Sequence, residues 1–179
     1  MRLFTAVDIP DEAKGKISAL YNNLKTPSYV KWIEKDNLHI TLKFLGETDK
    51  KIEIEKKIME IENRFSPFDV SLKNVGAFPS TRKARILWVG IEEGEDNLIE
   101  LFKAIDNKTS ELGFEKEGRK FIPHITFGRV KKGKYSLTEN IEFSFHPFPV
   151  KEITLFKSTL TPKGAIYETI SAIPLRGDS

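Results

Sequence analysis

The clearest pattern of hydrophobic and polar positions lies in residues 38–45, LHITLKFL. As far as Phe44, the apolar side chains occupy the even positions, while His39, Thr41 and Lys43 occupy the odd ones. Because successive side chains of a β-strand point to opposite faces, this period of two predicts a strand with one apolar and one polar face. We therefore expect Phe44 to face the core, and Lys43 to share the polar face of His39 as a solvated or phosphate-attracting side chain.

Three other segments show the three- and four-residue spacing of amphipathic helices. The first covers residues 11–24 and the third covers residues 96–112, with Gly113 placed to follow it in a left-handed conformation. Between them, Thr48 is placed to cap a helix whose apolar positions extend as far as Phe65.

Short runs rich in β-branched and aromatic residues predict further strands. They cover residues 2–8, 68–78, 85–91, 123–130, 149–157 and 165–172. Proline or glycine at 79–83 and 160–164 predicts hairpin connections, and the polar, glycine-containing segment 131–140 predicts a mobile loop. A sheet-rich α+β protein follows from this arrangement.

The two halves of the chain also resemble each other. Three pairs of segments match in chain order at similar offsets: 2–9 with 85–92 (85 − 2 = 83), 39–42 with 124–127 (124 − 39 = 85), and 67–70 with 147–150 (147 − 67 = 80). This ordered set indicates two similar strand–helix–strand units. Similar units tend to associate about a pseudo-twofold axis, which would bring the two His-Ile-Thr strands together.

Composition limits the possible classes of protein. A chain of 179 residues, with 39% hydrophobic and 31% charged residues, suits one compact domain or two small lobes sharing a core. The absence of cysteine excludes a disulfide scaffold, a cysteine nucleophile and a thiolate zinc site. The first residues lack the apolar span of a signal peptide or membrane helix, which predicts a cytoplasmic protein. The net charge of +3 permits an anionic partner.

Two of the three histidines lie in His-Ile-Thr triplets, His39 with Thr41 and His124 with Thr126. Residues two apart on a strand share a face, so each triplet places an imidazole beside a hydroxyl. Such side chains could simply be polar strand residues, since threonine suits strands. Two imidazoles can also serve as base and acid near neutral pH, and threonine hydroxyls can donate to phosphate oxygens. In-line cleavage of a phosphodiester needs these groups and no cofactor.

Other kinds of site have weaker support. Zinc usually takes three or four protein ligands, and here cysteine is absent and His146 is the only spare imidazole. We expect His146 at a strand end or turn beside Pro147. The sequence contains neither a Gly-x-Ser-x-Gly elbow nor a phosphate-binding P-loop.

Several longer strings resemble the two-histidine phosphoesterases, in the branch of RNA 2′,3′-cyclic phosphodiesterases, also called 2′-5′ RNA ligases. They are MRLFTAV, VKWIEKDNLHITLKFLGE, RILWVGI, FIPHITFGR and LFKSTLTPKGAIYE. The resemblance implies an α+β fold of two pseudo-symmetric lobes. Each lobe would be an antiparallel sheet with helices on its outer face, the HxTx motifs would face a central cleft, and residues 1–179 would form a single bilobal domain. It further implies hydrolysis of 2′,3′-cyclic phosphate ends of RNA to 2′-phosphates, without a metal ion.

The same resemblance assigns roles to particular residues. His39 and His124 become the catalytic pair, with His124 as the base for water and His39 as the acid for the leaving oxygen. Thr41, Thr126 and Arg129 become substrate-binding residues. Strand geometry places Arg129 on the face opposite His124, as a surface or edge residue, unless Gly128 marks a bulge or the strand ends there, because the two residues are five apart.

Some candidates for RNA contacts stay open at this point. Phe44 and Phe121 could stack a base, although the alternation favours a core position for Phe44. Trp32 could plug the core or line the cleft. Three lysines that follow the second motif have few acidic neighbours and could grip an RNA strand by contacts independent of sequence: Lys131, Lys132 and Lys134.

Two alternative functions also remain. A 2′-5′ RNA ligase would run the same transfer backward, with an RNA hydroxyl in place of water. A non-catalytic RNA- or nucleotide-binding module would use the cleft for recognition alone. A monomer suffices for all three functions.

Overall fold

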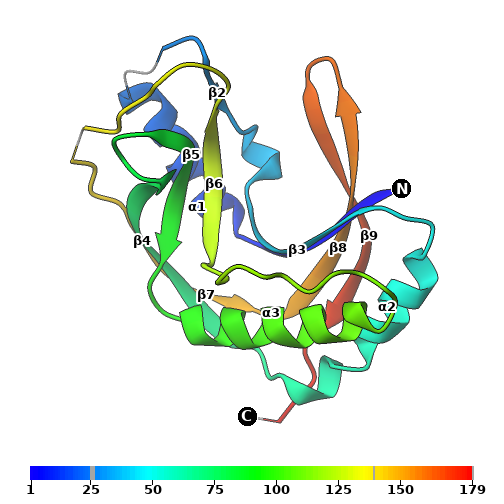
Figure 1. Ribbon diagram of the computed structural model, residues 1–179. Helices are drawn as coiled ribbons and strands as arrows, with labels where there is room; N and C mark the ends of the chain where they lie inside the picture. Colours follow the sequence, from blue (N-terminus) through cyan, green and yellow to red (C-terminus); the bar gives the residue numbers. More distant parts are fainter. Residues whose placement is uncertain (25–26, 139, 179) are drawn as a thin grey trace.

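The strands of the protein form two antiparallel sheets in a computed structural model that describes residues 1–24, 27–138 and 140–178 (Figure 1). The four strands of the first sheet, in spatial order, are β3 (His39–Glu47), β1 (Arg2–Asp8), β8 (Glu152–Thr161) and β9 (Gly164–Pro174). The five strands of the second are β2 (Val30–Trp32), β6 (His124–Val130), β5 (Ala84–Ile91), β4 (Phe68–Pro79) and β7 (Ser144–Val150). The helices are α1 (Asp11–Asn23), α2 (Lys51–Met59) and α3 (Glu95–Ser110), with short 3₁₀ turns at Lys35–Asn37 and Glu62–Arg64.

The pattern of apolar residues located most of these elements, and the α+β class is confirmed. The second helix ends at Met59, earlier than expected, because the chain turns into a 3₁₀ segment. The expected cap is wrong, because the N-cap position is Lys50 and no side chain caps the helix. The hydroxyl of Thr48 instead accepts from the backbone N–H of Lys50 at 3.1 Å, in the turn before the helix. Residues 131–138 and 140 contain no helix or strand, while residue 139 of the expected loop lies outside the described residues.

One strand prediction is wrong. The single strand expected at 149–157 is two strands, β7 and β8, which belong to different sheets and are separated by Lys151. The run of apolar and β-branched residues continues through this crossover, so the sequence pattern does not mark it. The three-residue strand β2 was also not predicted, because a segment this short shows no periodicity.

The sheet order repeats as the matching segments indicated. In one sheet β1 lies between β3 and β8, and in the other β5 lies between β6 and β4. The first matching segments therefore fall on the equivalent strands β1 and β5, and the second on β3 and β6. The third pair does not follow the repeat, because its segments fall on β4 and β7, which pair with each other in the second sheet. The motif strands β3 and β6 are in contact with each other although they belong to different sheets. The prediction that the two His-Ile-Thr strands come together is confirmed.

Two helices cross from the sheet of the preceding strand to the other sheet. Tyr21 of α1 stacks on Trp32 and Phe127 of the second sheet, with ring centroids 4.8 and 6.2 Å apart. Conversely, α3 follows β5 of the second sheet and contacts β3 of the first. One continuous cluster of buried side chains joins both sheets. In the described part of the chain, no helix combines the length and apolar character that crossing a bilayer requires.

A β-bulge in β3 reverses the expected directions of two side chains. Thr5 and Ala6 of β1 pair with Lys43 and Thr41, so Leu42 is the extra residue. After a bulge, the side chains that follow exchange faces. The expectation for Lys43 is therefore wrong, because this residue is only 7% exposed and lies on the core side of the sheet.

Buried Lys43 joins the first motif strand to α3 and to the segment leading to the second motif. Its ammonium forms an ion pair with the carboxylate of Asp106 and donates to the carbonyl oxygen of Glu115 at 2.7 Å. The Asp106 carboxylate also accepts from the backbone N–H of Glu117 at 3.2 Å. A buried charge with this many partners is tolerated because each desolvated group finds a hydrogen bond.

Removal of one partner should therefore destabilise the protein strongly. Lys43→Met leaves the Asp106 carboxylate buried without its cation, and the free energy of unfolding should fall by about 3–5 kcal/mol in urea titration. The double variant Lys43→Met/Asp106→Leu should recover part of this loss. The exposed Lys56 of α2 gives a matched control, Lys56→Met. A loss in Lys43→Met no larger than that of the control would contradict this account.

Candidate active site

Each motif strand turns an imidazole and a hydroxyl away from the core. In β3, Ile40 is fully buried whereas His39 and Thr41 are partly exposed. In β6, Ile125 is fully buried whereas His124 and its neighbouring threonine, Thr126, are partly exposed. The alternation predicted for both triplets is present, so the two His-Thr pairs lie on the faces of the sheets not occupied by the core.

A hydrogen bond to the backbone sets the tautomer of His39. Its Nδ1–H donates to the carbonyl oxygen of Asn37 at 2.5 Å, which requires the proton on Nδ1. In the neutral ring Nε2 is then bare, and it accepts from the hydroxyl of Thr41 at 2.6 Å. The Nε2 atom is thus the one available for proton transfer.

The second motif repeats this arrangement. The Nδ1–H of His124 donates to the carbonyl oxygen of Ile122 at 2.7 Å, two residues upstream as in the first motif. The imidazoles and their carbonyl partners are both 85 residues apart in the chain (124 − 39 and 122 − 37). Equivalent backbone geometry therefore presents Nε2 of both imidazoles in the same way.

Both imidazoles are held neutral in the free protein. Burial lowers the pKa of His39 from its usual 6.5 to about 4, although its hydrogen bond to Asn37 and the charge of Asp8 oppose this. Burial also lowers the pKa of His124, against the effect of its bond to Ile122. An imidazole whose pKa lies below neutral is suited to accept a proton. An anionic ligand beside it would raise that pKa again.

A second bulge places Arg129 on the catalytic face. Leu87 and Trp88 of β5 pair with Gly128 and Thr126, so Phe127 is the extra residue of β6. The bulge turns the exposed Arg129 to the side of the sheet that carries His124. Burial is the main cause of the lowered pKa of both His39 and His124, and the positive charge of Arg129 adds a smaller lowering of each. Arg129 was expected to share the face of His124 only if β6 contained a bulge between them or ended there, and the bulge at Phe127 meets the first condition.

The bulge in β3 has the corresponding effect on Phe44. The expected core position is wrong, because Phe44 is 67% exposed and projects on the side of His39. Its ring lies 5.8 Å from that of Phe4, which itself lies 5.1 Å from the imidazole of His39. Phe44 is also 85 residues before Arg129 (129 − 44), so the two residues occupy equivalent places after equivalent bulges.

Aromatic rings form the surroundings of His39. Phe4, Ala6 and Phe156 make a small buried cluster separate from the main core, with Tyr167 packed against it. The ring of Tyr167 meets the imidazole edge-on at 5.3 Å. These rings cover part of the imidazole, and burial is the main cause of the lowered pKa of His39.

On the second sheet, Phe78 takes the corresponding role beside His124, with ring centroids 5.0 Å apart. Phe78 in turn contacts Trp88 at 5.3 Å. The indole lies flat over Gly76, where an added Cβ would come within 2.3 Å of it. Glycine is required there so that the tryptophan can cover the sheet next to Thr126.

The remaining candidates lie away from the histidines. Trp32 stacks on Tyr21 beneath the sheet and also lines a groove at β2. Phe121 stacks on Phe102 of α3 at 4.3 Å and is a packing residue. His146 lies exposed in β7, 3.6 Å from the carboxylate of Glu12. In residues 1–24, 27–138 and 140–178, no three histidine, aspartate or glutamate side chains gather as a metal-binding group.

Sequence reasoning missed the catalytic-face position of Phe44 and the contact between Tyr167 and His39. The offset of 85 residues between the motifs could have found the first, because it maps Phe44 onto Arg129. No local signal points to Tyr167, which reaches the site through the pairing of β8 with β1 and β9.

The fold and the paired motifs define a two-histidine phosphoesterase. The profile of the LigT-like phosphoesterases matches residues 7–88 and again residues 89–167, one match for each half of the internal repeat. The chain belongs to this family.

Relatives and solved structures of similar length agree with this assignment. The RNA 2′,3′-cyclic phosphodiesterase of Methanocaldococcus jannaschii is 45% identical over 95% of this chain and 98% of its own, and that of Archaeoglobus fulgidus is 38% identical over the same shares. The crystal structure of TT0787 from Thermus thermophilus covers all of both chains with a TM-score of 0.87 at 26% identity. Escherichia coli LigT complexed with 3′-AMP covers 97% of each chain with a TM-score of 0.80 at 27% identity.

The lowered pKa values lead to a prediction about pH. In an NMR titration of the free protein, the His39 imidazole should titrate near pH 4, and that of His124 below 6.5. Because the pKa of His39 is lower in the folded than in the unfolded chain, protonation favours unfolding. The free energy of unfolding should therefore fall as the pH drops from about 6.5 toward 4, and less steeply in His39→Gln. A His39 signal that titrates at 6.5 or above would contradict this.

Proposed function

We propose that this protein hydrolyses 2′,3′-cyclic phosphate ends of RNA to 2′-phosphates. The observation that carries the proposal is the pair of contacting motif strands, each presenting Nε2 of a neutral imidazole next to a threonine, with Arg129 turned to the same face by a bulge. The curated relatives named RNA 2′,3′-cyclic phosphodiesterase support the choice of substrate.

The reaction needs a base, an acid and stabilisation of negative charge. One imidazole removes a proton from water as its oxygen attacks phosphorus, and the bond from phosphorus to the ribose 3′-oxygen breaks. The other imidazole protonates that leaving oxygen. Thr41, Thr126 and Arg129 donate hydrogen bonds to the non-bridging oxygens, where charge increases in the transition state. These groups supply the acid, base and electrophile without a metal ion, and one chain supplies all of them.

The division of roles between the histidines is part of the proposal. The family resemblance assigns the base to His124 and the acid to His39. The lower pKa of His39 supports the opposite division in the free enzyme, because a more buried imidazole holds a proton less readily. An anionic phosphate raises both pKa values, so either imidazole can carry the proton once substrate is bound.

The exposed ring of Phe44 supports a position for the base of the terminal nucleotide. It lies beside Phe4, next to His39, and offers a face to solvent. Aromatic side chains bind unstacked bases by stacking in many RNA-binding proteins. We therefore place the base on Phe44 and the phosphate between the two imidazoles.

Two alternatives are retained. A 2′-5′ ligase would use the same groups with an RNA 5′-hydroxyl in place of water, but water at about 55 M outcompetes it unless binding provides a high effective concentration. A non-catalytic RNA-binding module has less support. Recognition of phosphate does not require two imidazoles held in the same tautomer with Nε2 available for proton transfer.

The histidine variants provide the direct test. His39→Ala and His124→Ala should each lower kcat on 2′,3′-cyclic AMP by about 10²–10⁴-fold, because each loses one proton-transfer group. The assay contains EDTA, and product analysis should show a 2′-phosphate. The exposed third histidine gives the matched control, His146→Ala, which should retain the wild-type rate. Near wild-type rates in both motif variants would exclude the proposal, and tight RNA binding without any turnover would favour the module.

The same variants separate base from acid. A nitrophenyl phosphodiester has a leaving group that departs without a proton, so loss of the acid matters less on this substrate. The variant with the smaller defect on the nitrophenyl ester has lost the acid.

Removal of the stacking ring should mainly weaken binding. Phe44→Ala should raise KM for 2′,3′-cyclic AMP by about 5- to 100-fold with little change in kcat, because base stacking on an aromatic ring contributes roughly 1–3 kcal/mol. Phe44→Trp should retain wild-type KM. The exposed Ile52 of α2 provides the control, Ile52→Ala. An unchanged KM in Phe44→Ala would mean that the base lies elsewhere.

A further inference from the structure

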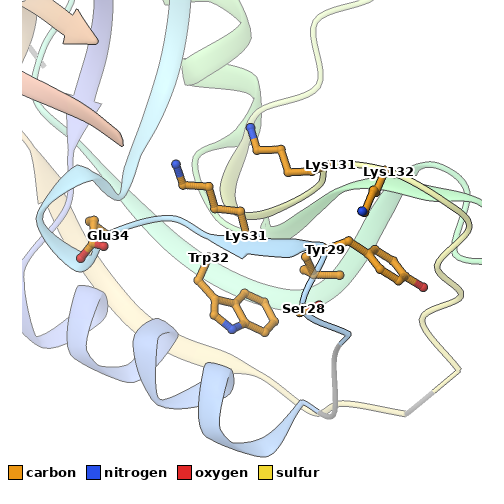
Figure 2. A pocket seen from close by; sticks show the side chains of 8 residues that line it. Ser28, Tyr29, Lys31, Trp32, Glu34, Lys131 and Lys132 are labelled. Atoms are coloured by element: carbon orange, nitrogen blue, oxygen red, sulfur yellow. The ribbon is translucent and has the colours of Figure 1, made fainter. Parts of the chain in front are cut away.

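A groove of about 650 Å³ lies at β2, the edge strand beside β6 (Figure 2). Three lysines and one glutamate supply its charged lining: Lys31, Lys131, Lys132 and Glu34. Tyr29 adds an aromatic ring. The groove therefore combines an excess of positive charge with a surface on which a base can stack.

Strand register places two lysines of this groove, Lys31 and Lys131, on the catalytic face of the sheet. Lys31 pairs with Arg129 across β2 and β6, and directly paired residues project to the same side. The backbone N–H of Lys131 donates to the carbonyl oxygen of Tyr29 at 2.8 Å, which extends the pairing by one step. Figure 2 shows Lys31 and Lys131 projecting to the same side of β2, whereas Trp32 points to the other side. The lysines thus share the face that carries Arg129 and His124.

The β8–β9 hairpin also approaches this groove. The ammonium of Lys31 lies 3.4 Å from the position that a Cβ would occupy at Gly164, in the turn of the hairpin. The carbonyl oxygen of the next residue, Ala165, accepts from the side-chain amide of Asn37 at 2.8 Å. Lys31 therefore stands between the hairpin turn and Arg129, beside the catalytic residues.

The spacing of the cations suits a polyanion. Residues two apart on a strand are roughly 7 Å apart, so Arg129 and Lys131 follow each other at a step similar to that between neighbouring phosphates of an extended nucleic acid strand. Proteins that bind single strands combine such a basic track with aromatic rings for the bases. The ring of Tyr29 is held in place because its hydroxyl donates to the carbonyl oxygen of Lys134 at 2.8 Å.

We propose that this groove binds the nucleotides immediately upstream of the cyclic phosphate, with Lys31 and Lys131 on their phosphates and Tyr29 against a base. The inference rests on the proposed function, because it takes the terminal phosphate to lie between the imidazoles. A hydrolase that acts on a cyclic end holds one strand, and every other nucleotide of that strand lies 5′ to the end. The enzyme therefore prefers oligonucleotide ends over cyclic mononucleotides.

The test compares substrates of different length. At low salt, wild-type kcat/KM should be at least tenfold higher for a tetranucleotide ending in a 2′,3′-cyclic phosphate than for 2′,3′-cyclic AMP. Lys31→Ala/Lys131→Ala should raise KM for the tetranucleotide about tenfold and leave cyclic AMP turnover within twofold of wild type. Lys31→Arg should retain the preference, and Lys56→Ala on α2 is the matched control.

Salt dependence gives a second readout. For a labelled tetranucleotide ending in a 2′-phosphate, the slope of log binding constant against log salt should be shallower by about 1.4 in the double variant, or roughly 0.7 for each lost phosphate contact. The inference would be overturned if the double variant lost the same activity on the tetranucleotide and on cyclic AMP, or if the wild type showed no preference for the tetranucleotide. In either case, turnover of cyclic AMP by the wild type would still support the proposed function. A defect only in joining a separate 5′-hydroxyl strand would assign the groove to that strand and overturn the upstream placement.

Discussion

The alternation of side chains along two β-strands, interrupted by a bulge directly after each His-Ile-Thr motif, is the constraint on which the site depends. Before each bulge, alternation separates a buried isoleucine from a histidine and threonine that face outward. After each bulge, the faces exchange, so Phe44 and Arg129 join the histidines while Lys43 turns into the core. A strand of strict period two would place neither Phe44 nor Arg129 on the catalytic face.

The equivalent bulges produce a site that is symmetric in backbone but not in chemistry. Both imidazoles are oriented by a carbonyl two residues upstream, which fixes their tautomers without an acidic side chain. The residue after the bulge differs, an aromatic ring in one unit and a guanidinium in the other. A duplicated scaffold thus supplies proton transfer from both halves, base stacking from one and charge stabilisation from the other.

Burial makes the two halves unequal in electrostatics as well. Three rings, those of Phe4, Phe156 and Tyr167, pack around His39, whereas Phe78 packs against His124. Burial is the first cause of both lowered pKa values, and it lowers that of His39 to about 4. An anionic phosphate counteracts this penalty, so binding of substrate and protonation of an imidazole favour each other.

The sequence alone determined the motif strands, both His-Thr pairs, the α+β class and the internal repeat, because these depend on local periodicity and on residue types that recur at a fixed offset. The tertiary structure decided which way Phe44 and Lys43 point, that Arg129 shares the face of His124, and that β7 and β8 divide between the sheets. It also placed Tyr167 against His39, and Lys31 next to Arg129. These features depend on the register between strands that lie far apart in the chain. One extra residue in a strand moves every side chain after it to the opposite face, and the hydrophobic pattern does not show where that residue is.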